Sequence, residues 1–577
     1  MKLSDYVINF LNERYNIDTV FTVSGGGCIH LLDSLGRNEK INYIATHHEQ
    51  GAAIAAEGYA RHKNNLGACL VTSGPGGTNC LTGTLCSYLD SVPVIVLSGQ
   101  VNRNMTTNYL NLKMRQLGDQ EFDIVKTVSS MTKYAVQIND PKEIRYHLEK
   151  ACFLAISGRP GPVWIDIPLD VQSAQIEPEK LKSFDANSFH QYNSVSKKTL
   201  DLILSKLNSS KKPLIIVGNG VRISNGIESL NYFLNKTKFP VITAVNGNDI
   251  VNESYENYFG RFGTHAQICA NNLINEADFI LSIGSRLYVR QIGYNFDAFG
   301  KNAYKVVVDI DGTELDKPTM RSDLKIQCDA NDFLLKISSL DLPRASDNWI
   351  STCNSYKNSS VLDRHRNKTQ FVSNYFLIER LSQLLSLDYD IVTSDGSANV
   401  VTMQVIKLKD NQRLITNTGC APMGYGLPCA IGVACNSKKV LCIEGDGSLH
   451  MNIQELQTVK HNKLPIKILL LNNDGYLSIK ITQKTFFDGR YVGSEKNSGV
   501  TFPNFKKISE AYELPYFCIR EHTEIDNVLK DFLSLEGPCI CEVFTDPNEI
   551  HEPKVVAKLD DNGNFIPGEL HDIKWAE

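Results

Sequence analysis

Short apolar stretches alternate with amphipathic stretches from one end of the chain to the other. The apolar stretches, rich in Val, Ile and Leu, are typical of strands in parallel sheets, which are buried on both faces. Between them, apolar residues recur three and four positions apart, as in helices that cover a sheet. This alternation predicts an α/β protein built from doubly wound parallel sheets.

The predicted strands fall into three blocks, which we expect to be three domains. In the first block, residues 1–172, strands are expected at 19–23, 41–46, 67–72 and 93–98. In the second block, residues 195–342, they are expected at LIIVG, PVITAV, FILSIG and KVVVDID. In the third block, residues 365–577, they are expected at IVTSDG, KVLCIEGDGS, IKILLLNNDG and CICEVF. A chain of 577 residues is too long for one hydrophobic core, and three domains agree with its length.

Two polar stretches and the C-terminal end lack the periodicity of a packed element. The stretches near 173–198 and 341–368 are rich in Ser, Asn and charged residues, so we expect them to be linkers. Beyond Lys554 the sequence has no apolar period, and we expect a tail there.

The composition excludes several classes of protein. Hydrophobic residues make up 42% and charged residues 21%, as in an ordinary globular protein, and the formal net charge is only -5. No basic stretch suits a phosphate backbone, so nucleic acid is not an expected partner. No apolar run reaches the roughly 18–20 residues that span a bilayer, and the first residues form an amphipathic helical pattern rather than a signal peptide. We therefore expect a cytoplasmic protein without a membrane partner.

Fifteen cysteines are scattered along the chain without a Cys-x-x-Cys pair. Several of them, such as Cys69 and Cys442, lie inside apolar runs. This distribution predicts reduced thiols used as small core residues, rather than a metal site or a disulfide framework.

The third block carries the motif with the clearest chemistry. Gly445-Asp446-Gly447-Ser448 follows the strand KVLCIE, and Asn472-Asn473 ends the next expected strand. Asp446 and Asn473 are 27 positions apart, so a helix and a strand separate them and both should lie at the carboxyl edge of one parallel sheet. Either motif alone is read as a turn or a strand end. Together their oxygen atoms suit Mg²⁺, and the turn amides suit a diphosphate.

A carboxylate in the first block stands out for a different reason. The strand INYIAT leads into His47-His48-Glu49-Gln50-Gly51, followed by a run of Ala and Gly. A carboxylate in the first turn of a helix is commonly there because it stabilises the helix. Here the small residues permit close helix packing, which would bury Glu49 at least in part. A buried carboxyl group is suited to acid–base chemistry.

These motifs, with others along the chain, resemble the acetolactate synthase family of thiamine-diphosphate (ThDP) enzymes. TSGPGGTN at 72–79, LDSVPVIVLSGQV at 89–101, the Gln120-Glu121 pair and GRPGPVWIDIP at 158–168 resemble the first domain of that family. MGYGLPCAIG at 423–432 and EGDGSLHMNIQEL at 444–456 resemble its third domain. The resemblance covers nearly the whole chain. It implies decarboxylation of a 2-oxo acid, most simply pyruvate, and transfer of the acyl carbanion to a carbonyl acceptor.

The resemblance also implies roles for individual residues. The Glu49 carboxyl group would contact the aminopyrimidine of ThDP and activate it, with Gln120 beside it in catalysis. Met423 would support the bent cofactor. Mg²⁺ ligands would come from the side chains of Asp446 and Asn473 and from the Gly475 carbonyl group. Further cofactor contacts implied in the same way are Gly25, Gly26, Asn399, Ala421, Gly447, Ser448 and Tyr476.

The family's active sites lie between subunits, so the resemblance implies a homo-oligomer, either a homodimer or a homotetramer. Glu49 would come from one chain and the metal site from the other. The expected small-molecule partners are a 2-oxo acid and a carbonyl acceptor.

The second block resembles the domain in which that family binds FAD without net redox use. The residues that carry this resemblance are Gly218, Gly220, Arg286 and Asp309, with Arg159 from the first block. Gly218-Asn219-Gly220 is a poor NAD fingerprint, because Ile223 stands where the third glycine belongs. Gly260-Arg261-Phe262-Gly263 departs from the family's Gly-Met-His-Gly. A scaffold with a vestigial or empty site is therefore the alternative to bound FAD.

Two further departures bear on the acceptor. Gln483 aligns with a tryptophan of the family, and Asp119, just before Gln120, aligns with a phenylalanine. Polar groups select a hydroxylated acceptor better than an apolar wall does. We therefore expect a polar acceptor, such as a keto sugar. The alternative is that Gln483 lies on a solvated helix face and Asp119 in a mobile loop.

Three other functions are left open. A simple 2-oxo acid decarboxylase would share the fold, although the segment NLKMRQLGDQEF lacks the paired histidine of pyruvate decarboxylases. A pyruvate oxidase would use FAD in redox chemistry. A catalytically silent ThDP-fold subunit would be expected to lack Glu49, Asp446 or Asn473, and all three are present.

Overall fold

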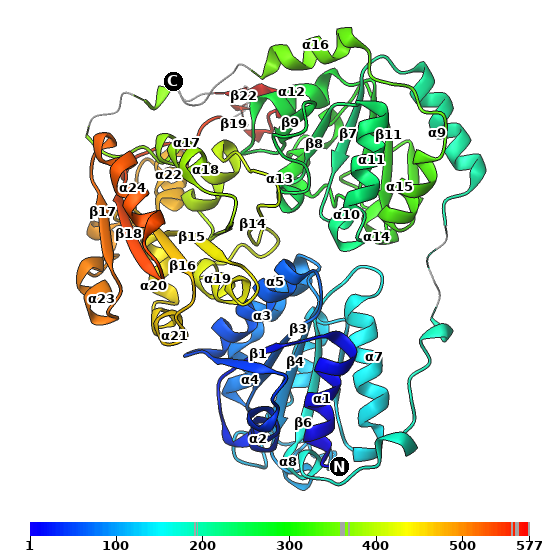
Figure 1. Cartoon of the computed structure of the whole chain (residues 1–577), viewed down its shortest axis with the longest axis vertical. Coiled ribbons are helices and arrows are strands. Elements are labelled where there is room, and N and C mark those ends of the chain that lie inside the picture. Colours follow the sequence, from blue (N-terminus) through cyan, green and yellow to red (C-terminus); the bar gives the residue numbers. More distant parts are fainter. Residues whose placement is uncertain are drawn as a thin grey trace.

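The computed structural model describes residues 1–577 except 190–191, 193, 358–363, 367–369, 556–557, 560–564 and 575–577. The chain forms three lobes, each built around a six-stranded parallel sheet with helices packed against it (Figure 1). The first block lies in blue and cyan, the second in green, and the third in yellow and orange. The predicted α/β architecture of three doubly wound sheets is confirmed.

The sheet of the first block has the order β2-β1-β3-β4-β6-β5. Its strands are β1 Thr19–Thr22, β2 Asn42–Ala45, β3 Gly67–Val71, β4 Val94–Gln100, β5 Tyr134–Gln137 and β6 Val163–Pro168. Its helices are α1 Leu3–Tyr15, α2 Ile29–Arg37, α3 Glu49–Lys63, α4 Pro75–Asn79, α5 Leu81–Leu89, α6 Ile124–Val128, α7 Ile144–Ile156 and α8 Leu169–Gln172. The strand order reverses between β1 and β3, which places the ends of these strands at a crevice suited to a ligand.

The sheet of the second block has the order β12-β11-β10-β7-β8-β9. Its strands are β7 Pro213–Val217, β8 Val241–Thr243, β9 Tyr258–Arg261, β10 Phe279–Ile283, β11 Tyr304–Asp309 and β12 Leu324–Gln327. Its helices are α9 Lys197–Ser209, α10 Gly220–Ile223, α11 Ile227–Thr237, α12 Ile268–Glu276, α13 Val289–Ile292, α14 Gly312–Leu315, α15 Ala330–Ser338 and α16 Asp347–Tyr356.

The sheet of the third block has the order β14-β13-β15-β16-β18-β17. Its strands are β13 Tyr389–Thr393, β14 Leu414–Ile415, β15 Lys439–Gly445, β16 Ile466–Asn472, β17 Tyr516–Ile519 and β18 Cys539–Phe544. Its helices are α17 Asn374–Leu384, α18 Ser397–Val405, α19 Gly426–Ala434, α20 Asp446–Met451, α21 Glu455–His461, α22 Leu477–Phe486, α23 Phe505–Ala511 and α24 Ile525–Ser534.

Every strand expected from an apolar run is present, whereas β5, β6, β9, β12, β14 and β17 lie outside the predicted set. All of these except β6, which lies between β4 and β5, occupy sheet edges. An edge strand has a neighbour on one side only, and several of these strands are short or partly exposed. The continuous apolar run that marks a central strand is therefore missing from them.

The first and third blocks pack through α3 and α19, whose backbones approach closely at two glycines. A Cβ added to Gly58 would lie 2.3 Å from the Cys429 carbonyl oxygen, and one added to Gly432 would lie 1.9 Å from the Ala55 carbonyl oxygen. The small-residue run after Glu49 therefore serves the close helix packing that the sequence predicts.

Two segments expected to be unstructured connections are partly ordered. The second linker contains α16, whose Trp349 is buried in the core of the second block and donates from Nε1 to the Pro213 carbonyl oxygen at 2.9 Å. The tail forms β19 Lys554–Val555 and β22 Ile573–Lys574, which pair with each other, and the short strands β20 Lys558–Leu559 and β21 Phe565–Ile566. Leu570 enters the same core as Trp349.

The tail therefore packs on the second block, although it follows the third in sequence (Figure 1). A few apolar side chains suffice to dock a segment on a formed core, and too few of them occur to give a periodic pattern. Within the parts of the chain that the structure describes, every helix is too short or too polar to cross a lipid bilayer.

Candidate active site

The predicted metal ligands meet at the carboxyl edge of the third sheet. β15 and β16 are hydrogen-bonded neighbours, with Gly445 opposite Leu471. Asp446 opens α20 directly after β15, and Asn473 follows β16. The backbone amides of Gly447, Asn473 and Gly475 donate to the Asp446 carboxylate at 2.7, 3.0 and 3.3 Å. The two motifs are therefore adjacent in space, as their spacing predicts.

Burial alters the chemistry of Asp446. The residue is 2% exposed, and burial raises the pKa of its carboxyl group to about 7, although the amides of Gly447 and Gly475 act in the opposite direction. A buried carboxylate is costly unless a positive charge lies beside it. A divalent cation would supply that charge and favour the ionised form.

Asn473 places a second oxygen atom near Asp446. Its side chain is buried, and Oδ1 has no hydrogen-bond partner among the residues that the structure describes. No cluster of three or more His, Cys, Asp or Glu side chains that could hold a metal occurs in the described parts of the chain. A metal here would thus bind one carboxylate and neutral oxygens, which Mg²⁺ accepts when phosphate oxygens complete its shell. The residues present fit Mg²⁺ bound with a diphosphate.

Met423 and Tyr476 lie against the turn that carries Asp446. A Cβ on Gly447 would lie 2.2 Å from Cε1 of Tyr476 and 3.2 Å from Cε of Met423. Only glycine fits between these side chains and the turn. Three residues from distant parts of the third block, each predicted to contact the cofactor, therefore share one place.

The segment between β14 and α19 is fixed by side chains on both sides. Asn417 accepts from the Ala421 amide at 3.0 Å, and Ala421 has a left-handed backbone with φ 51°. The Gly424 amide donates to Ser448 Oγ at 2.8 Å. These bonds hold Met423, which lies between Ala421 and Gly424, beside the turn at α20.

Asn399 and Glu444 support the same edge of the sheet. The Asn399 amide donates to the Thr416 hydroxyl, so this predicted contact residue faces the end of β14. Glu444 is fully buried, accepts from the Leu427 amide at 2.8 Å, and has its pKa raised to about 7 by burial. The sequence reasoning missed Glu444, although a carboxylate inside the apolar strand KVLCIE was a visible signal.

In the first block, Glu49 opens α3 and is only 9% exposed. Its Oε2 accepts from Asn79 Nδ2 at 2.9 Å. A Cβ on Gly76 would lie 3.6 Å from its Oε1. The predicted burial of Glu49 is confirmed, and the carboxyl group faces the TSGPGGTN motif.

The predicted glycines of the first block differ in their surroundings. A Cβ on Gly25 would lie 2.5 Å from Thr72 Cβ, so packing alone requires glycine there. Gly26 is exposed, and no described atom lies within 4 Å of the position of an added Cβ. Gly27, which the sequence reasoning missed, donates its amide to Thr72 Oγ1 at 2.9 Å.

The Gln120-Glu121 pair divides into a buried and an exposed member. The Glu121 carboxylate accepts from the Thr107 amide and hydroxyl at 2.8 and 2.6 Å and from the Leu117 amide at 2.8 Å. Gln120 is exposed and has a left-handed backbone with φ 60°. Glu121 therefore holds the preceding segment in shape, and Gln120 lies at its surface.

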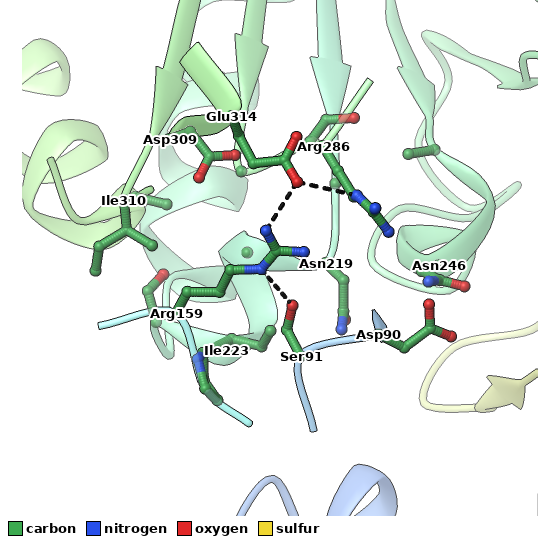
Figure 2. A pocket seen from close by; sticks show the side chains of 18 of the residues that line it. Asp90, Ser91, Arg159, Asn219, Ile223, Asn246, Arg286, Asp309, Ile310 and Glu314 are labelled. Atoms are coloured by element: carbon green, nitrogen blue, oxygen red, sulfur yellow. Dashed lines mark hydrogen bonds and ion pairs between the residues drawn. The ribbon is translucent and has the colours of Figure 1, made fainter. Parts of the chain in front are cut away.

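The second block and the first enclose a cavity of about 220 Å³. All five residues predicted to bind FAD line it, namely Arg159, Gly218, Gly220, Arg286 and Asp309. Figure 2 shows Glu314 between the two arginines, at 2.8 Å from Arg159 Nη1 and 3.0 Å from Arg286 Nε. Burial raises the pKa of Asp309 to about 6.

The glycines of this cavity are needed for packing. A Cβ on Gly218 would lie 2.3 Å from the Gly284 carbonyl oxygen, and one on Gly220 would lie 2.7 Å from Gly284 Cα. Ser285, beside them, is buried, and its Oγ has no partner in the described residues. The unpartnered hydroxyl, the strand-end carboxylate of Asp309 and the two arginines suit a ribose and a diphosphate, so the residues present fit a dinucleotide such as FAD.

Arg261, which replaces a methionine of the family, does not line this cavity. It is 1% exposed, and its Nη1 donates to the carbonyl oxygens of Met403 and Ile406 at 3.4 and 2.9 Å. These carbonyl groups lie at the end of α18, where a cation is favourable. The departure at 260–263 therefore ties the second block to the third.

The sequence reasoning also missed a buried network between the first and third blocks. Arg61 pairs with Glu57 at 2.7 Å and with Asp90 at 2.8 Å. Asp90 accepts from the amides of Thr418 and Gly419 at 3.0 and 2.9 Å. This network fixes the segment that leads to Met423.

Comparison with known families agrees with this geometry. Residues 1–126 match the thiamine pyrophosphate enzyme, N-terminal TPP binding domain, where thiamine pyrophosphate is another name for ThDP. Residues 200–337 match the central domain of these enzymes, and residues 395–543 match their C-terminal TPP binding domain.

Individual relatives match over nearly their whole length. The chain is 32% identical to the acetolactate synthase large subunit of Lactococcus lactis subsp. lactis over 567 residues, which cover 96% of this chain and 94% of the relative. It is 30% identical to the acetolactate synthase isozyme 2 large subunit of Escherichia coli, covering 95% and 96%, and 30% identical to the large subunit of Porphyra purpurea, covering 94% and 92%. The chain therefore belongs to the acetolactate synthase-like family of thiamine-diphosphate-dependent enzymes.

Proposed function

We propose that this enzyme decarboxylates a 2-oxo acid, with pyruvate as the donor, and joins the remaining acyl unit to the carbonyl carbon of a polar acceptor. The observation that carries the ThDP- and Mg²⁺-dependent part of the proposal is the buried Asn473 Oδ1 beside Asp446, which lacks a protein partner among the described residues. Bound ThDP supplies the nucleophilic carbon and takes up the electron pair that decarboxylation releases.

Each residue of the site has a role that its surroundings support. Asp446, Asn473 and the Gly475 carbonyl group would hold Mg²⁺ against the diphosphate. Met423 and Tyr476, packed on Gly447, would orient the cofactor. The following residues would contact it through backbone or side chain: Gly25, Gly26, Asn399, Ala421 and Ser448.

Glu49 would hold a proton at the aminopyrimidine ring of the cofactor. Its burial beside Asn79 keeps water away from that proton. Gln120, exposed on a segment that Glu121 fixes, would contact the substrate.

The polar acceptor is supported by Gln483, whereas Asp119 is exposed in the segment before Gln120. Gln483 is half-buried on α22, and both ends of its amide are engaged: Nε2 donates to the Val492 carbonyl oxygen at 3.0 Å, and Oε1 accepts from Ser494 Oγ at 2.7 Å. These bonds use one N–H and one lone pair, so the fixed amide keeps a second N–H and a second lone pair. These remaining groups would favour a hydroxylated acceptor such as a keto sugar.

Mass spectrometry of products tests this proposal. With pyruvate alone, the enzyme should form little acetolactate; with pyruvate and a hydroxylated ketone, it should form the branched adduct. Gln483→Trp with Asp119→Phe should shift the product ratio toward acetolactate. Ser494→Ala is the matched control, because it removes the bond to Gln483 Oε1 and keeps the polar side chain. An unchanged ratio in the double variant would contradict the polar acceptor; acetaldehyde or acetyl phosphate as the main product would indicate a decarboxylase or an oxidase.

We also propose that the cavity between the first and second blocks holds FAD without net redox use. The support is the set of arginines, the Asp309 carboxyl group and the unpartnered Ser285 hydroxyl that line it. Purified enzyme should then show flavin absorption in the visible range. Arg286→Met should lower the amount of flavin that the purified enzyme retains, whereas Arg321→Met, on the surface of the same block, should not. Colourless protein that takes up no added FAD would favour an empty scaffold.

Finally, we propose a homo-oligomer, a dimer or a pair of dimers, with active sites shared between chains. Two segments near the site expose many large apolar side chains, which isolated monomers rarely do. The first segment exposes Met105, Tyr109, Leu110, Leu112, Met114, Leu117 and Phe122, and the second exposes Ile479, Phe486, Phe487 and Val492.

A further inference from the structure

Two cysteines from different blocks face each other beside the proposed cofactor site. Cys86 lies on α5 of the first block, and Cys420 lies in the segment that connects β14 to α19 of the third. Cys86 is fully buried, whereas Cys420 is partly exposed. The two thiols lie close enough for each to shift the pKa of the other. We propose that Cys86 and Cys420 form a reversible disulfide that locks the segment carrying Met423 to the first block and lowers turnover.

The backbones of the two cysteines are held close by one amide. Asn417 Nδ2 donates to the Cys86 carbonyl oxygen at 3.2 Å, and Asn417 Oδ1 accepts from the Cys420 amide at 3.1 Å. Gly419, next to Cys420, packs so tightly on the end of α5 that an added Cβ would lie 2.8 Å from Leu89 Cβ. A disulfide needs this kind of approach, because its Cα atoms can be no more than about 7 Å apart.

The two thiols differ in pKa and in exposure, as a thiol pair that reacts with an oxidant requires. The interaction with Cys86 lowers the pKa of Cys420, while the interaction with Cys420 and burial raise the pKa of Cys86 well above its usual value. Cysteines in the apolar cores, such as Cys152 and Cys442, have raised pKa values because of burial. A partly exposed thiol of lowered pKa beside a second thiol is the arrangement found in redox-sensitive pairs.

A second close pair lacks this access. Cys69 raises the pKa of the neighbouring Cys80 thiol, yet both residues are completely buried in the first block. Cys435 has the opposite deficiency: it is partly exposed, and its thiol donates to the Ile431 carbonyl oxygen of its own helix. These cysteines provide internal controls for the reaction of Cys420.

The oxidant we infer is a small disulfide, such as oxidised glutathione. The Cys420 thiolate attacks one sulfur, the S–S bond of the oxidant breaks, and one glutathione thiolate leaves. Cys86 then loses its proton and attacks the mixed disulfide at Cys420, which forms the Cys86–Cys420 bond and releases the second glutathione. Two protein thiols are thereby oxidised, and one small disulfide is reduced to two thiols.

The cross-link would act on the segment between β14 and α19 that carries Met423. Cys420 is followed by Ala421 and, two positions later, Met423, which packs on the turn at Gly447. Joining this segment covalently to α5 would prevent its adjustment around bound ThDP. This effect on turnover rests on the proposed role of Met423, whereas formation of the cross-link does not.

The experiment treats the enzyme, loaded with ThDP and Mg²⁺, with increasing oxidised glutathione and follows two readouts. Digestion without reductant should yield a peptide joining the segments around Cys86 and Cys420, with two hydrogens lost. Cys86 shares its tryptic peptide with Cys69 and Cys80, and Cys420 shares its own with Cys429 and Cys435, so fragment-ion sequencing must assign the link. Turnover should fall at least about tenfold in parallel and return when dithiothreitol is added.

Cys86→Ala and, separately, Cys420→Ser should abolish both the link and the loss of turnover, while Cys435→Ala should behave as the wild type. Thermal unfolding of each variant checks that it is folded. Absence of the linked peptide from oxidised wild-type enzyme would overturn the proposal. A linked peptide with unchanged turnover would overturn the control of activity and leave the assignment of the ThDP site untouched.

Discussion

At the scale of single residues, the site combines buried carboxyl groups with oxygen atoms that have no hydrogen-bond partner in the described part of the chain. Asp446 and Glu444 are both buried at the end of β15, and burial raises the pKa of each to about 7. Such groups are costly in a folded protein unless a ligand compensates them. The first two predictions test whether Glu49 and Asp446 carry the roles we assign to them.

Glu49→Gln should lower turnover by about 10²–10⁴-fold, because the amide keeps the shape of the side chain and removes its acid–base chemistry. The affinity for ThDP, measured by calorimetric titration, should change little. Turnover close to that of the wild type would show that another group activates the cofactor.

Asp446→Ala should abolish Mg²⁺-dependent binding of ThDP, since it removes the only carboxylate we assign to the metal. Titration of ThDP with and without Mg²⁺ measures this. Asp488→Ala, beyond the end of α22, serves as the control and should bind ThDP as the wild type does. If Asp446→Ala retains its affinity and metal dependence, the metal lies elsewhere.

A third prediction concerns Asp166, which is buried on β6 and accepts from Ser98 Oγ at 2.6 Å. Burial raises the pKa of its carboxyl group to about 7, above the value of about 3.9 in an unfolded chain. Between these two values the unfolded chain releases a proton that the folded chain keeps. The stabilising contribution is therefore fully present below about pH 4 and is lost as the pH rises to about 7.

Asp166→Asn should remove this dependence. As the pH rises from 4 to 7, the free energy of unfolding of the wild type should fall by up to about 4 kcal/mol relative to that of Asp166→Asn. This corresponds to about 1.4 kcal/mol for each pH unit. Urea unfolding over this range measures the difference, with Asp201→Asn on the exposed face of α9 as control. Parallel curves for wild type and Asp166→Asn would contradict the raised pKa.

At the scale of elements, the crossing of α3 and α19 places the segment that carries Met423 against the first block. The crossing depends on glycines at which backbones touch. Glycine normally weakens a helix interior, so its presence at Gly58 and Gly432 reflects packing between blocks.

Gly432→Ala should destabilise the enzyme by about 3 kcal/mol, because its Cβ would lie 1.9 Å from a backbone oxygen of α3 that cannot move independently. Gly36→Ala in α2 is the matched control: no described atom lies within 4 Å of its added Cβ, and it should stabilise the helix by about 1 kcal/mol. Chemical unfolding compares the two. Equal effects would mean that the helices can separate at no cost.

At the scale of the whole molecule, the second block is bound to both of its neighbours. Arg261 reaches α18 of the third block, Arg159 of the first block reaches Glu314, and the tail packs on the core around Leu570. The three lobes in Figure 1 are thus joined by more than their linkers. Sharing of active sites between chains is the property that remains to be tested at this scale.

Mixing two inactive variants tests that sharing. In a dimer of one Glu49→Gln chain and one Asp446→Ala chain, one site would carry both defects and the other would carry none. After equal amounts are unfolded and refolded together, half of the dimers are mixed, so about one quarter of wild-type turnover should return. Each variant refolded alone should stay inactive. Failure to regain turnover in mixtures whose mixed dimers are detected by mass spectrometry would place each active site within a single chain.

The sequence by itself determined the α/β class, the central strands other than β6, and the pairing of Asp446 with Asn473. These features depend on local periodicity and on the rule that successive parallel strands end at one edge of a sheet. The burial of Glu49 also followed from the sequence, because the Ala- and Gly-rich run that buries it is adjacent in the chain. Edge strands such as β5 and β17 could not be predicted, because one open side removes the apolar signal.

Only the tertiary structure decided which distant residues meet. The approach of Gly432 to Ala55, the bridge of Asn417 between Cys86 and Cys420, and the docking of Leu570 in the second block each join residues far apart in the chain. A local pattern records how a residue is buried and not what buries it, since many side chains can fill the same environment. The partners of Arg261 and Asp90, and with them the position of the segment that carries Met423, are for this reason properties of the fold.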